Sequence, residues 1–117
     1  MTLRQAQGGG DGLWHLLIHT PGPAADPNVP FFEAPWFAEH RAFHARLSDA
    51  GYFVAAGPLP DRDGAGQTLV RGVSTDEIGR LARETDPAVA GGFLEVEIVP
   101  WRVVESVLDV PLESGPG

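Results

Sequence analysis

Cysteine is absent from the 117-residue chain. This excludes disulfides, thiolate nucleophiles and thiolate metal ligands, and it fits a reducing compartment. Basic residues are also few, because 8 of them stand against 16 acidic residues and leave a net charge of −8. They are scattered along the chain, so no basic surface for nucleic acid or for an anionic membrane is expected. The expected partner is a small molecule or another protein.

Long hydrophobic runs are missing as well. No window approaches roughly 18 consecutive apolar residues, so we expect no membrane span, no leader sequence and a cytoplasmic location. Phosphate-binding loops and the G-x-S-x-G and H-E-x-x-H motifs are absent too. The length suits a single domain. We assign it to residues 13–104, with a flexible N-terminal tail over 1–12 and a mostly flexible C-terminal extension over 105–117.

What the sequence does contain is a hydrophobic pattern that predicts six elements in the order βαββαβ. Strands are expected over residues 13–20, 52–56, 68–73 and 93–99, and helices over about 35–50 and 74–85. Gly57-Pro58 should break the second strand, and Ser74 with Glu77 forms a capping-box pattern ahead of the second helix. The order favours an α+β, ferredoxin-like fold, in which a four-stranded antiparallel sheet carries two helices on one face.

Such a sheet has one face that the helices leave uncovered. We expect that face to carry Leu17, together with His15, His19, Glu95, Glu97 and Val99. Packing against a second copy would cover it, which predicts a homodimer. Imidazoles and carboxylates on one face could in principle hold a metal, but alternating polar residues are common on solvated sheets. We therefore predict no metal site and no cofactor.

A candidate acid-base pair follows from topology. The first helix begins where the first strand ends, which places His40 at that end of the sheet. The second helix finishes at the same end and brings Asp86 there. His40 would act as general acid or base, and Asp86 would orient it or stabilise its charged form. In the competing interpretation His40 is only a hydrogen-bonded helix residue and Asp86 only ends a helix.

Five further residues are expected around a substrate: Phe32, Trp36, His44, Gly57 and Pro58. The aromatic residues would line or cover a pocket, and the backbone at Gly57 could bind a substrate oxygen. Each residue also has a structural interpretation. The aromatic side chains could anchor the loop, His44 could be a partly buried polar residue, and Gly57-Pro58 could be an ordinary turn.

Several short segments together resemble the YciI-like (YCII-related) family: Trp36–Phe43, Leu47 with Gly51, Ala56–Leu59, Asp86-Pro87 and Val96–Trp101. The resemblance covers roughly residues 13–104. It implies a ferredoxin-like fold that dimerises as an α/β barrel, with a site made by the helix histidine and the Asp-Pro aspartate, which match His40 and Asp86. His44 lies outside the family pattern, and the loop before the helix is longer and richer in proline.

The resemblance also bears on the reaction. One characterised branch of the family removes chloride from a chlorinated hydroxyhydroquinone, and the related muconolactone isomerases shift a double bond. Both reactions move protons on small oxygenated rings. We therefore expect a cofactor-independent isomerase, lyase (dehydrochlorinase) or cyclase, with a cofactor-free oxygenase as a second enzymatic option. The alternative is a non-catalytic dimer that binds a metabolite or assists a biosynthetic pathway.

Overall fold

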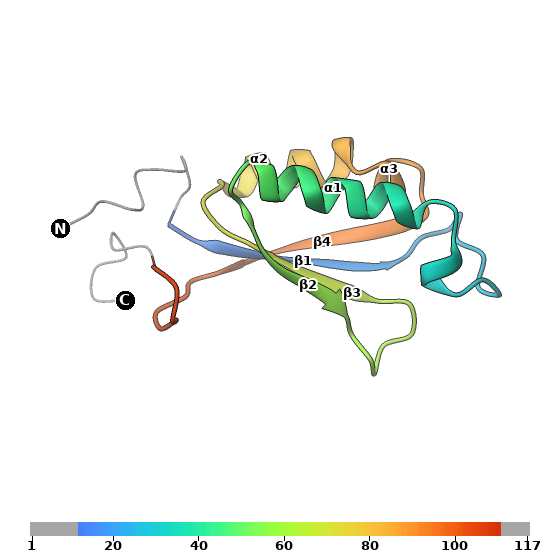
Figure 1. Ribbon diagram of the computed structural model, residues 1–117, viewed down its shortest axis with the longest axis horizontal. Helices are drawn as coiled ribbons and strands as arrows, with labels where there is room; N and C mark the ends of the chain where they lie inside the picture. The colour runs from blue at the N-terminus through green and yellow to red at the C-terminus, as the bar shows by residue number, and fades with distance from the viewer. Residues whose placement is uncertain (1–11, 111–117) are drawn as a thin grey trace.

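Four strands form one antiparallel sheet in the computed structural model, which describes residues 12–110. The strands are β1 (Trp14–Pro21), β2 (Phe53–Pro58), β3 (Gly66–Val70) and β4 (Leu94–Trp101), and their order across the sheet is β2-β3-β1-β4. The helices α1 (Phe37–Asp49), α2 (Thr75–Arg80) and α3 (Pro87–Ala90) lie on one side of the sheet (Figure 1). The fold is therefore α+β.

Local sequence explains where the two longer helices begin and end. In α1, His40, Phe43 and Leu47 are buried at helical spacing, and Gly51 follows with a φ of 85°, which suits glycine. Helix α2 starts after Ser74, whose Oγ accepts a hydrogen bond from the Glu77 backbone N–H at 3.1 Å. The predicted cap at Ser74 is thus confirmed.

The segment predicted as one helix over 74–85 consists of two parts. Helix α2 continues into a turn of π-helix over Leu81–Thr85. Asp86 then takes an extended conformation, and the short helix α3, which the sequence analysis did not predict, begins at Pro87. Proline suits the first helical position because no intrahelical partner exists there for an N–H. The consequence is that Asp86 stands at a break between two helical segments.

The main core lies between the sheet and the helices. It contains Leu17 from β1, Val70 from β3, Phe43 and Leu47 from α1, and Ile78 from α2, together with Val73 and Ala82. A second cluster around Trp36, Ala88 and Leu94 covers the end of the sheet where β4 begins. The first cluster packs α1 against β1, and the second packs α3 against the start of β4. The candidate site lies on β1, on α1 and at the start of α3.

The prediction that Leu17, His15 and His19 lie on the uncovered face is wrong. All three are buried on the helix side, since Leu17 packs against α1 and α2. Glu95 and Glu97 pair with Thr20 and Ile18 and are exposed on the opposite face. Alternation shows which residues share a face but not which face the helices cover. The potential metal ligands that the sequence analysis placed on one face therefore lie on both: His15 and His19 on the helix side, and Glu95 and Glu97 on the opposite side.

The face without helices carries the other residues of the central strand. Register places Leu16 of β1 opposite both Leu69 of β3 and Val99 of β4, and Leu69 opposite Ala55 of β2. Directly opposed residues share a face, so these four apolar side chains form one row across the sheet. We call Ala55, Leu69, Leu16 and Val99 the outer apolar row.

The sequence analysis predicted that Gly57-Pro58 breaks the second strand, and this prediction is wrong. Gly57 pairs with Gln67 and Pro58 with Gly66, so β2 runs through both residues. Proline is compatible with this position because β2 is an edge strand. The pairing of β2 with β3 shifts register between Phe53 and Ala55.

The predicted N-terminal tail lies outside the described residues except for Gly12, and so do residues 111–117 of the predicted C-terminal extension. Of that extension, residues 105–110 form no helix or strand, and the Asp109 carbonyl accepts a hydrogen bond from Arg71 at 2.9 Å. Within residues 12–110, no helix has the length and apolar character needed to cross a membrane.

Candidate active site

The predicted pair of His40 and Asp86 is in direct contact. His40 Nδ1 lies 2.7 Å from Asp86 Oδ2, although the two residues are 46 positions apart in the chain. Asp86 is fully buried and His40 is 5% exposed. Because a carboxylate only accepts, His40 donates its Nδ1 proton to Asp86. The neutral ring then carries its lone pair on Nε2, as a general base requires.

The second carboxylate oxygen of Asp86, Oδ1, is also bonded. Asp86 is the capping residue of α3, and its Oδ1 accepts a hydrogen bond from the Ala88 backbone N–H at 3.0 Å. The residue before it is also fixed, since Arg46 of α1 donates to the Thr85 carbonyl at 2.5 Å. One carboxylate oxygen thus fixes the backbone and the other orients His40, so the pair is preorganised by both helical segments.

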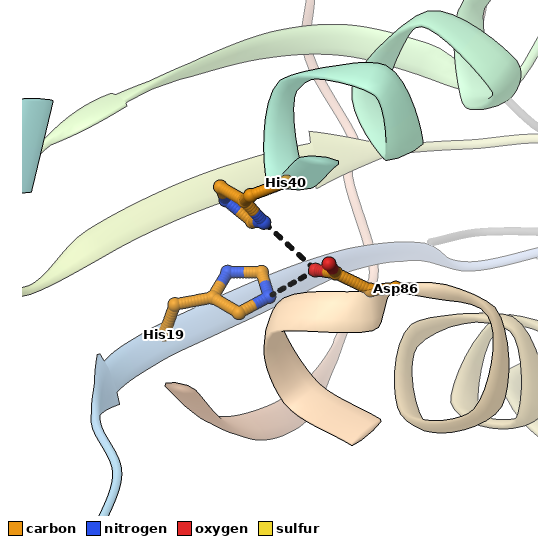
Figure 2. A group of neighbouring side chains, drawn as sticks. All are labelled: His19, His40 and Asp86. Carbon is orange, nitrogen blue, oxygen red and sulfur yellow. Dashed lines mark hydrogen bonds and ion pairs between the residues drawn. The ribbon is translucent and has the colours of Figure 1, made fainter. Parts of the chain in front are cut away.

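A second histidine, which the sequence analysis did not assign to the site, joins this pair. His19 of β1 is 1% exposed, and its Nε2 lies 4.0 Å from Asp86 Oδ2. Its ring meets that of His40 edge to face, with centroids 4.7 Å apart. Figure 2 shows both imidazoles directed at the same carboxylate. Period-two alternation with Leu17 would have indicated His19 if the buried face had been identified correctly.

His44 lies one turn further along α1, beside His40. The two ring centroids are 4.5 Å apart. His44 Nε2 and Thr68 Oγ1 of β3 form a hydrogen bond of 3.0 Å. Histidines from β1 and α1 therefore adjoin one another along the interface between the sheet and α1.

The histidines border a cavity of about 170 Å³. His19, His40 and His44 line one part of it, whereas Asp86 does not line it. Among the described residues, none hydrogen-bonds to His40 Nε2, which leaves that nitrogen for a bound molecule. The remaining walls come from the loop before α1, from α1 itself and from the β2–β3 hairpin: Phe31, Phe32, Phe37, Arg41, Ala56, Gly57, Pro58, Ala65, Gly66, Gln67 and Thr68.

Four of the five residues predicted to surround a substrate line this cavity: Phe32, His44, Gly57 and Pro58. Trp36 does not. It is 8% exposed and stacks on Phe93 at a centroid distance of 6.0 Å, within the second core cluster. Trp36 does line a broader neighbouring hollow of about 730 Å³ under the 21–34 loop. Phe32 is 68% exposed and borders both spaces.

Burial sets the charge state of two of the histidines. Burial, reinforced by the neighbouring His40, lowers the pKa of His19 to about 3, although Asp86 acts in the opposite direction. Burial and His40 likewise lower the pKa of His44 to about 4. Both rings are therefore neutral at physiological pH. Asp86 is the one carboxylate in contact with His40 among the described residues.

The lowered pKa of His19 predicts a loss of stability in acid. The unfolded chain binds a proton at His19 below about pH 6.5, whereas the folded chain resists it down to about 3. Stability from this residue is therefore complete above pH 6.5 and is lost as the pH falls through that window. Between pH 7 and 5 we expect a decrease of roughly 2 kcal/mol in the free energy of unfolding from His19 alone.

Urea unfolding at several pH values, without divalent metal ions, measures this effect. His19→Gln removes the titrating ring, so its unfolding free energy should fall by roughly 2 kcal/mol less than that of wild type over the same range. An unchanged pH slope in His19→Gln would contradict the assignment.

Comparison of the chain with family models, curated proteins and solved structures found no match.

Proposed function

We propose that the chain is a cofactor-independent enzyme that transfers protons on a small oxygenated or aromatic metabolite. The observation that carries this proposal is the 2.7 Å contact between His40 Nδ1 and the buried Asp86 carboxylate, beside a cavity that His40 lines. Asp86 fixes the tautomer of His40, and His40 Nε2 then takes a proton from the substrate and returns it at another atom. Isomerisation, elimination and cyclisation all require only such a positioned transfer.

The cavity supports a small planar substrate. Its volume of about 170 Å³ is small, and three phenylalanines from the loop and α1 form part of its wall. Aromatic faces bind planar rings, whereas the imidazoles, Arg41 and Gln67 offer polar contacts to ring oxygens. This combination suits a single oxygenated ring, such as a phenol, an enol or a lactone.

The proposal extends to family and assembly. The sheet order β2-β3-β1-β4 with helices on one side is compatible with a ferredoxin-like subunit, and the His40 and Asp86 contact involves the two residues that match the YciI-like pattern. A dimer in which two such sheets face each other would cover the outer apolar row. We propose a homodimeric α/β barrel of the YciI-like type.

Deuterium incorporation tests the proposed proton transfer before the natural substrate is known. Small phenols, enols and lactones are incubated with the protein in D₂O, and exchange at carbon is measured by NMR and mass spectrometry. A suitable compound should exchange at least roughly 100-fold faster with wild type than with His40→Gln, because one positioned acid-base group contributes about that much or more. Compounds that bind in the cavity without exchange or turnover would instead favour the metabolite-binding alternative.

A further inference from the structure

The three buried side chains in Figure 2 are all of types that bind metals. His19 comes from β1, His40 from α1 and Asp86 from the turn before α3. One potential ligand atom from each lies within 4.8 Å of the others. Two imidazoles and one carboxylate are a common ligand set for Zn²⁺ and for other divalent transition metals.

His19 provides an independent reason to expect a ligand here. Its Nε2 is buried and has no hydrogen-bond partner within the described part of the chain. A buried polar atom left without a partner is destabilising, because it has lost its hydrogen bonds to water. The separation of 4.0 Å between His19 Nε2 and Asp86 Oδ2 is too long for a hydrogen bond but leaves space for a shared ion.

The geometry is close to that of a three-ligand site. Tetrahedral coordination at bond lengths near 2.0–2.1 Å separates ligand atoms by roughly 3.3 Å. The observed separations from Asp86 Oδ2 are 2.7 Å to His40 and 4.0 Å to His19, on either side of that value. Small side-chain rotations would equalise them. The Ala88 N–H bond to Oδ1 supplies the outer support that metal-binding carboxylates usually have.

Charge and access agree with this geometry. His19 presents its Nε2 to the Asp86 carboxylate, with 4.0 Å between that nitrogen and Oδ2. His19 and His40 both border the cavity, whereas Asp86 does not line it. The net charge of −8 also favours the approach of cations.

We propose that His19, His40 and Asp86 form a binding site for one divalent transition ion of the Zn²⁺ type. The ion takes the place of the proton between His40 and Asp86, so the metal-loaded site and the proton-transferring pair exclude each other. The proposal goes beyond the proposed function, because binding of the metal requires no substrate and no turnover.

Calorimetric titration of the chelator-stripped full-length protein with Zn²⁺, and with Co²⁺ read by visible absorption, tests the site. We expect one ion per chain at micromolar or tighter affinity. His19→Gln should weaken binding roughly 100-fold or more, as loss of a metal ligand generally does. His15→Gln should bind like wild type, because His15 faces Thr75 rather than Asp86. Absence of binding below millimolar Zn²⁺, or unchanged affinity in His19→Gln, would overturn the proposal.

A second measurement on wild type keeps the test valid if His19→Gln fails to fold. X-ray absorption of the Zn²⁺-loaded protein should show two imidazoles and oxygen ligands, and Zn²⁺ should raise the melting temperature by binding only the folded state. One imidazole, or none, would exclude the site. Deuterium exchange is measured with chelator present, so failure of the metal proposal and failure of the proposed proton transfer are distinguished.

Discussion

His40→Gln should lower the rate of enzyme-dependent deuterium exchange by roughly 10²–10⁴-fold. Glutamine retains a polar side chain near the size of imidazole but cannot take a proton at neutral pH. Ligand affinity should change much less than the rate, because the cavity walls are otherwise intact. The measurement is the exchange rate at saturating compound, together with a binding constant from calorimetry.

Asp86→Asn separates the two roles within the pair. It keeps the shape of the carboxylate while removing the charge that would stabilise an imidazolium in the transition state. Exchange should fall substantially with little loss of affinity, and the double variant should be hardly slower than His40→Gln alone. Strictly additive losses would mean that Asp86 acts independently of His40.

His15→Gln is the matched control for His40→Gln. It removes a fully buried imidazole from the same interface between sheet and helices, but one that is bonded to Thr75 at the start of α2. Its exchange rate should stay close to that of wild type. If His15→Gln and His40→Gln slow exchange equally, the slower exchange of His40→Gln reflects a general disturbance of the fold rather than loss of the base.

The contact between His40 and Asp86 could be predicted from the sequence because it depends on connectivity. The end of β1 and the end of the 75–85 helical segment lie at the same end of the sheet in a βαββαβ arrangement, which places His40 and Asp86 in the same region. Asp86-Pro87 also marked the helix end correctly. What the sequence did not indicate was α3, a single helical turn whose cap is Asp86 itself.

The face of β1 could not be predicted, and this is why His19 was missed. Trp14, Leu16 and Ile18 read as the apolar, inward face, whereas the structure buries His15, Leu17 and His19 against the helices. The polar groups near these imidazoles come from distant segments, since His15 bonds Thr75 and His19 Nε2 lies 4.0 Å from Asp86 Oδ2. Local periodicity contains no information about such partners.

Because the uncovered face of β1 carries Leu16 rather than Leu17, the residue that tests the dimer is Leu16. Leu16→Glu should convert the proposed homodimer to monomer, because Leu16 is central in the outer apolar row, between Leu69 and Val99. In a two-fold dimer each subunit would place a carboxylate against apolar surface and near its symmetry mate. Such juxtaposition costs several kcal/mol, or roughly a thousandfold in the dimer dissociation constant.

Light scattering coupled to size exclusion at micromolar concentration measures the result. Wild type should run at twice the chain mass of 12.5 kDa and Leu16→Glu at that mass, with the circular dichroism of both unchanged. Val107→Glu adds the same charge at a fully exposed valine outside the sheet and should remain dimeric. Leu17→Lys, in contrast, should unfold the chain, because Leu17 is 0% exposed within the core. A wild-type monomer would rule out the barrel, whereas a dimer that tolerates Leu16→Glu would place the interface on another surface.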